Sequence, residues 1–374
     1  MAFYCVDGLL HAEGESKEPV VPAVIDGYSP TLEGKVLFKY IADGLLKGAN
    51  GKEGEGKQLS FLDIYSSPKL IFNKHLSMNS ALEYRPVSKR AGGNGEEGYL
   101  SRKNYLFSGY GLLIPRLNFE YREEQFMFGI GKFDPSFSEA LSSKRYYGIL
   151  GTNIVDEYQL TEKVGFYVAM ILPMLNLRFN FFKNDSSFLS RSIINDRGAN
   201  SSRDNIGSAS LFENFSLTVN LKMENNCNIN MGFRRMISAN SEKEAENGYV
   251  IGGEGIIEET NESLGMVPAI EVVLLNNYTG DPHKNAGFLS VNTPFYYGRW
   301  SFGFGLGGKV DFVDRLKDVG YGVLFQGSIG YELANGLAID ISRKYEKNSY
   351  FENGSRKKED LSSWGIGISY SLKL

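Results

Sequence analysis

The chain has 374 residues, a formal net charge of −4 and a mean hydropathy of −0.25. This slightly acidic balance, without a basic patch interleaved with aromatic residues, argues against nucleic acid as a partner. A transmembrane helix is also excluded, because the longest apolar run ends at Pro173 and is far shorter than the ~18 residues that such a helix needs.

The first thirty residues are expected to precede the folded domain. Residues 1–12, MAFYCVDGLLHA, resemble the end of a signal peptide with a cleavage site at residues 10–12, although a basic start is missing and Asp7 interrupts the apolar run. An ordinary flexible N-terminus is the alternative. Residues 13–30 are polar and contain prolines, and we interpret them as a periplasmic lead-in. Removal of residues 1–12 would leave Cys227 without a disulfide partner.

Residues 31–374 contain long segments in which apolar and polar side chains alternate, which indicates β-strands with one apolar face. We expect an irregularity at Pro68, because proline cannot donate a ladder hydrogen bond. Strands are predicted at about 32–40, 58–72, 76–85, 105–121, 126–133, 161–172, 175–183, 210–223, 227–238, 248–257, 263–275, 287–297, 299–313, 319–333, 337–347 and 361–374.

The last of these segments shows the pattern most clearly. Trp364, Ile366, Ile368 and Tyr370 fall on one face of the strand, and serines and glycines fall on the other. The alternation is longer than the roughly 5–6 residues of a strand in a soluble sheet. It matches the ~9–11 residues with which a tilted strand crosses a bilayer. An edge strand of a soluble sheet is the alternative, but recurrence of the pattern upstream favours lipid on one side and water on the other.

Short turns and longer polar loops alternate between the predicted strands. The turn at residues 334–336, Ala-Asn-Gly, is a strong hairpin signal, whereas residues 44–57 form a polar loop. This alternation is typical of barrels with short periplasmic turns and long outer loops. The sequence therefore predicts an all-β, transmembrane antiparallel β-barrel of about sixteen strands, with fourteen to eighteen possible. The alternation requires a strand at residues 249–257.

Motifs for enzyme chemistry and for cofactors are weak. Residues 303–308, GFGLGG, run into another strand, whereas a dinucleotide-binding loop opens a helix. The three histidines have no metal-ligand spacing, and neither a nucleophile elbow nor an HExxH motif is present. We therefore expect no enzyme activity, cofactor or metal.

Residues 134–159 form an unusually long connection with many apolar side chains. The strand that follows, residues 164–172, is apolar on both faces, and Tyr167, Ala169 and Ile171 are expected to point into the lumen. A lumen face needs apolar side chains only where something covers it. We expect the 134–159 loop to fold inward and to cover this strand. A surface loop packed against its neighbours is the alternative.

Residues 129–140 and 147–166 resemble the strand-and-loop region of Gram-negative bacterial porins, including substrate-selective ones. In that family the third outer loop folds into the barrel, and the 134–159 loop is the third outer one here. The closing strand resembles the family's assembly signal, but it ends in Leu374 instead of Phe or Trp. The resemblance implies an outer-membrane channel for passive diffusion of small hydrophilic solutes or ions, and often a trimer.

Charged residues on the inward phase would shape such a pore. Opposite charges across a narrow, low-dielectric constriction create a transverse field that orders water and favours polar solutes. Salt bridges that fix the loop are the alternative role. The predicted set comprises Arg85, Arg116, Arg178, Lys222 and Arg234 on the wall, with Glu139, Asp156 and Glu157 on the loop.

Two other functions stay open at this point. A surface adhesin or substrate-specific receptor with a plugged barrel could use the polar loops at residues 184–208 and 349–360. An outer-membrane enzyme would need a catalytic pair at the rim, where His283 is the only suitably placed histidine.

Overall fold

The computed structural model describes residues 30–373 except 48–57, 88–108, 139–152, 195–205, 224–225, 259–263, 314–317, 334–335 and 353–354. The predicted signal-peptide remnant and, apart from Pro30, the predicted periplasmic lead-in lie outside the described residues. Cys5 and Glu139 also lie outside them.

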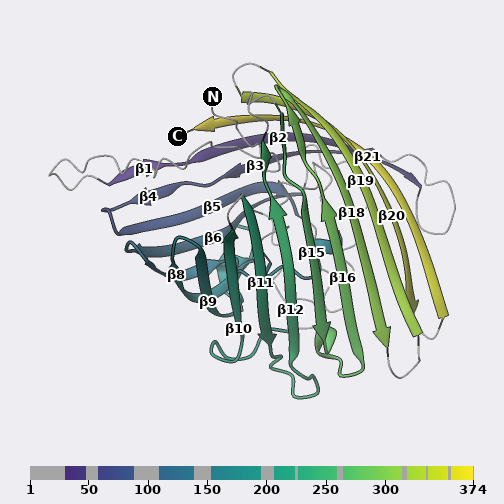
Figure 1. Cartoon of the computed structure of the whole chain (residues 1–374), viewed down its shortest axis with the longest axis horizontal. Coiled ribbons are helices and arrows are strands. Elements are labelled where there is room, and N and C mark those ends of the chain that lie inside the picture. Colours follow the sequence, from purple (N-terminus) through teal and green to yellow (C-terminus); the bar gives the residue numbers. More distant parts are fainter. Residues whose placement is uncertain are drawn as a thin grey trace.

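Antiparallel strands make up nearly all of the described chain (Figure 1). In chain order they are β1 (Thr31–Glu33), β2 (Lys35–Lys47), β3 (Gln58–Ser66), β4 (Lys69–Ile71), β5 (Leu76–Pro86), β6 (Tyr110–Arg122), β7 (Phe126–Phe133), β8 (Lys163–Ile171), β9 (Leu175–Asn184), β10 (Phe215–Met223), β11 (Cys227–Met236), β12 (Glu246–Gly255), β13 (Ile257–Glu258), β14 (Leu264–Met266), β15 (Ala269–Asn276), β16 (Lys284–Asn292), β17 (Phe295–Tyr297), β18 (Trp300–Val313), β19 (Asp318–Glu332), β20 (Leu337–Glu352) and β21 (Ser355–Lys373). In the described connections lie three short helices, α1 (Asn153–Asp156), η2 (Phe188–Ser190) and η4 (Tyr278–Gly280).

The strands form a closed sixteen-stranded barrel, which confirms the predicted fold. Several barrel strands are interrupted, so that β1 with β2, β3 with β4, β12 with β13, β14 with β15, and β16 with β17 each count as one. The sheet closes where β21 pairs with β2, in a register that places Tyr370 opposite Phe38. Figure 1 shows the yellow C-terminal strand beside the purple N-terminal one.

The two faces of the strands differ as the alternation predicts. On β21, Ile366, Ile368 and Tyr370 are exposed on the outer face, whereas Gly367 and Ser369 between them are buried. The same outward apolar phase recurs around the barrel, with exposed Phe38, Phe119, Phe128, Val168, Met231, Ile251, Val272, Leu289, Phe304, Phe325 and Ile341. An exposed apolar belt of this kind is the surface that a membrane barrel turns to lipid.

The strand containing Pro68 is interrupted as expected. β3 ends at Ser66 and β4 begins at Lys69, and the Pro68 carbonyl still accepts a hydrogen bond of 3.0 Å from the Ser80 backbone. The segment around Pro68 therefore stays hydrogen-bonded to β5, although proline has no backbone N–H group to donate.

The expectation of a loop at residues 349–360 is wrong. β20 continues to Glu352 and β21 starts at Ser355, so that Ser349 pairs with Lys358 in a regular ladder. The hairpin is longer than a bilayer crossing needs. A strand that extends past the bilayer needs no apolar alternation, so the pattern disappears there although the backbone pairing continues.

Among the described residues, no helix is long and apolar enough to cross a bilayer.

Candidate functional site

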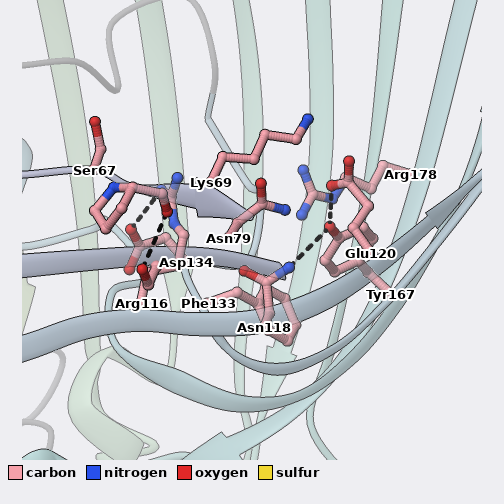
Figure 2. A pocket seen from close by; sticks show the side chains of 12 residues that line it. Ser67, Lys69, Asn79, Arg116, Asn118, Glu120, Phe133, Asp134, Tyr167 and Arg178 are labelled. Carbon is pink, nitrogen blue, oxygen red and sulfur yellow. Dashed lines mark hydrogen bonds and ion pairs between the residues drawn. The ribbon is translucent and has the colours of Figure 1, made fainter. Parts of the chain in front are cut away.

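A polar cavity of about 350 Å³ lies on the inner wall of the barrel (Figure 2). Its lining includes Asn118, Glu120 and Tyr167, which alternate with the outward-facing Phe119, Tyr121 and Val168. The cavity is therefore built from the inward phase of neighbouring strands. Its lining residues are Ser67, Pro68, Lys69, Asn79, Ser80, Arg116, Asn118, Glu120, Phe133, Asp134, Tyr167 and Arg178.

Tyr167 organises one side of this cavity. Its hydroxyl donates a hydrogen bond of 2.7 Å to Glu120, and the Arg178 guanidinium carbon lies 3.9 Å from the centre of its ring. A Cβ at Gly129 would lie 2.2 Å from the Tyr167 ring, so only glycine leaves space for the ring at this position. Arg178 also donates to the Asn180 amide oxygen over 3.1 Å, which fixes the guanidinium above the ring.

The other side of the cavity is joined to the base of the 134–159 loop. Arg116 pairs with Asp134 over 3.2 Å, and the second Asp134 oxygen accepts a hydrogen bond of 2.8 Å from the Glu162 backbone. Lys69 also lines the cavity and has no ion-pair partner among the described residues. Three basic and two acidic side chains therefore face this space.

The described flanks of the loop, residues 134–138 and 153–159, contact the opposite part of the inner wall. Phe137, Ile154 and Tyr158 are at most 4% exposed and join one apolar cluster. The wall contributes to that cluster from β9, β11, β12, β15, β16 and β19, with Phe182, Met236, Val250, Val273, Leu275, Phe288 and Leu324 among its residues. Residues 139–152 lie outside the description, so the path of the whole loop stays a prediction.

Polar contacts anchor the same flanks. The Glu271 carboxylate is 1% exposed and accepts hydrogen bonds from the Ser138 hydroxyl, at 2.6 and 2.7 Å, and from the Tyr158 hydroxyl, at 2.8 Å. Glu157 pairs with Lys309 on β18 over 2.6 Å. Glu271 thus binds both loop flanks to the wall, and Lys309 adds a cation for the second flank.

Arg234 holds the loop from beneath. Its guanidinium pairs with Glu246 over 2.6 Å, donates to the Tyr158 carbonyl, and lies 4.7 Å from the centre of the Phe137 ring. Arg234 is 2% exposed, so the prediction that it lines an open lumen is wrong. It is buried because the loop flank lands on it.

The other predicted pore residues are scattered. Arg116 and Arg178 are brought together at the cavity, whereas Arg85 pairs with Glu83 over 3.2 Å further along β5. Lys222 is exposed at the end of β10, and Asp156 is exposed at the end of α1.

Sequence reasoning missed Lys69, Asn118 and Glu120 as cavity residues. The sequence did contain a pattern that could have identified them, because each is a polar side chain on the inward phase of a strand. Tyr167 was expected to face the lumen beneath an apolar loop. It lines the polar cavity instead, where its hydroxyl donates a hydrogen bond to Glu120.

Among the residues described, no group of three or more His, Cys, Asp or Glu side chains could hold a metal ion. Cys227 is a free thiol.

The sequence matches no protein-family model and no curated protein. The fold is similar to solved outer-membrane proteins. These include the outer membrane channel DcaP of Acinetobacter baumannii, with a TM-score of 0.57 and 12% identity over 92% of this chain and 97% of that chain. OmpT of Vibrio cholerae, an outer membrane protein in its trimer form, has a TM-score of 0.54 and 10% identity over 92% of this chain and 100% of that chain. OccAB3 of Acinetobacter baumannii has a TM-score of 0.54 and 8% identity over 92% of this chain and 99% of that chain.

These structures share their architecture with this chain at very low identity. The chain therefore has the fold of a bacterial outer-membrane, porin-like barrel. Its exposed apolar belt is the surface that such barrels place in the membrane.

Proposed function

We propose that this chain is an outer-membrane channel through which small hydrophilic solutes or ions diffuse passively. One observation carries the proposal: a polar, charge-lined cavity occupies one part of the inner wall, while the loop flanks are anchored on the opposite part. A lining of this kind can replace part of a solute's hydration shell, which is what a selective passage requires.

The proposed mechanism uses the arrangement of charge. Lys69, Arg116 and Arg178 face Glu120 and Asp134 within one confined space. Their fields act over a few ångströms of water beside low-dielectric walls, so they orient polar solutes and discriminate between ions. No bond is made or broken in such a passage, so we propose that the chain is a conduit and not an enzyme.

We also propose that the channel is a homo-oligomer. The support is the fold similarity to OmpT of Vibrio cholerae, whose structure is described as a trimer form. Light scattering of the detergent-solubilised protein, corrected for bound detergent, measures the number of subunits directly.

Reconstitution in a planar lipid bilayer tests the channel. We expect discrete conductance steps from the folded protein and none from a heat-denatured sample. Swelling of proteoliposomes in solutions of sugars of increasing size gives the size limit. Folded protein that gives neither steps nor swelling would refute the proposal and would favour a plugged receptor.

A further inference from the structure

The outer face of β20 carries an arginine within the apolar belt. Ile339, Ile341 and Tyr345 are exposed on this face, and Arg343 shares their outward phase and is also exposed. A charged side chain on the lipid face of a barrel is unfavourable unless its charge reaches a polar partner. Arg343 has no ion-pair partner among the described residues.

The immediate neighbours of Arg343 leave space beside it. In the ladder it lies opposite Gly327 on β19 and opposite Trp364 on β21. A Cβ at Gly327 would have no atom within 4 Å, so the barrel surface is open at this point. The arginine therefore borders a hollow in the outer wall that a large side chain at residue 327 would have filled.

The depth of Arg343 follows from strand geometry. It lies six residues after Leu337, where β20 begins just beyond the short 333–336 turn. A rise of ~3.3 Å per residue at a tilt of ~40° places its Cα roughly 15 Å above that turn, inside an apolar band about 25 Å tall. Long basic side chains extend toward the headgroup layer from such positions.

A second cation lies on the same face at that layer. Lys347 is four residues beyond Arg343, and the same geometry places it roughly 10 Å higher. Asp360 is exposed opposite Lys347 in the ladder, but no ion pair joins them. Tyr345 lies between the two basic residues and presents a phenol hydroxyl. Arg343, Tyr345 and Lys347 together are termed the Arg343 face.

We propose that the Arg343 face binds the phosphorylated headgroup of a lipid in the outer leaflet. A phosphate accepts paired hydrogen bonds from a guanidinium and is attracted by an ammonium, and the Tyr345 hydroxyl adds a third donor. The acyl chains of the same lipid would lie along the apolar belt and the hollow at Gly327. A phosphorylated lipid thus matches both the charge and the apolar surroundings of this face.

A contact with an acidic residue of a second copy is the competing assignment. The hollow is open toward the belt, and the two cations are aligned along the strand toward the outer leaflet. Both features favour a lipid.

Native mass spectrometry of the full protein in detergent, with added diphosphoryl lipid A, tests the proposal. Loss of two charge-assisted contacts in the double variant R343Q/K347Q should lower lipid retention roughly tenfold or more. The matched control is K183Q/R235Q, which removes basic residues from the outer ends of β9 and β11. It should retain lipid as the unaltered protein does.

Three results would overturn the assignment. One is equal lipid retention by R343Q/K347Q and the control. Another is complete displacement of the lipid by inorganic phosphate, since the face would then bind a free anion. The third is a change in subunit number in R343Q/K347Q with unaltered lipid retention, which would identify a contact between copies. Single variants K347Q and R343Q, checked for heat-dependent migration in SDS, keep the test valid if the double variant does not fold.

Discussion

The two parts of the inner wall of this barrel differ although both are built from the inward phase of alternating strands. Along β4 to β9 the inward side chains line a polar cavity. Along β11 to β19, and at Phe182 on β9, they pack beneath the loop flanks into a buried apolar cluster. The inward phase alone therefore does not determine the environment of a side chain. An inward side chain is buried in an apolar core where the loop flanks pack against it, and it faces water where they do not.

The same contrast holds for ion pairs. The Arg116 and Asp134 side chains are 45% and 36% exposed, whereas those of Arg234 and Glu246 are 2% and 3% exposed. An exposed pair contributes roughly 0–1 kcal/mol to stability. Loss of one partner from a buried pair costs about 3–5 kcal/mol, because the other charge is left without compensation.

The largest expected effect is therefore at Arg234. We expect Arg234→Leu to lower the free energy of unfolding by about 3–5 kcal/mol, since Glu246 and the Tyr158 carbonyl lose their donor. Urea unfolding of the micelle-bound protein measures this change. The double variant Arg234→Leu with Glu246→Leu should recover most of the loss. A double variant as unstable as the single one would contradict the buried-pair account.

A smaller effect is expected at Phe137, which is 1% exposed in the apolar cluster. Phe137→Ala should lower the free energy of unfolding by about 3 kcal/mol. This is the low end for the truncation of a buried phenylalanine, because a loop flank can shift to fill the space left behind. Phe188→Ala is the matched control, since Phe188 is 78% exposed. Thermal unfolding of both variants provides the comparison. Equal effects would mean that the loop flank does not pack against the wall.

Substitutions at the cavity should change transport more than stability. Arg116→Gln should change the free energy of unfolding by less than about 1 kcal/mol. Lys69→Gln with Arg178→Gln should move ion selectivity toward cations, because Glu120 and Asp134 then dominate the local field. The reversal potential in a salt gradient measures the shift, which should shrink near 1 M salt, where the Debye length is ~3 Å. Selectivity that stays unchanged at low salt would place the passage elsewhere.

Sequence alone predicted the barrel well, because the physics that sets it is local. Each strand must alternate between lipid and interior, so Ile366, Ile368 and Tyr370 were assigned to the outer face without knowledge of their neighbours. The hairpin at residues 349–360 was missed for the same reason, since a strand beyond the bilayer need not alternate. The pairing of Ser349 with Lys358 leaves no trace in the apolar pattern.

The candidate site was harder to predict, because it depends on contacts between distant segments. Arg116 and Arg234 are both inward arginines, yet one lines a cavity and the other is buried beneath Phe137 and Tyr158. Nothing in the local sequence of either arginine distinguishes them. The apolar residues of the 134–159 loop predicted that it would fold inward and cover the strand at residues 164–172. The apolar cluster beneath its described flanks is instead built from β9, β11, β12, β15, β16 and β19.

The most direct test of the central claim, that solutes pass through the polar part of the interior, fills the cavity with a large side chain. Asn79 lines the cavity, and an indole there would occupy much of its volume of about 350 Å³. Asn79→Trp should lower the single-channel conductance to roughly half or less, because ion flow depends on the open width of the narrowest part. Ser210→Trp, at an exposed position outside the cavity, should leave conductance unaltered. Folded Asn79→Trp protein that conducts like the unaltered channel would contradict the account.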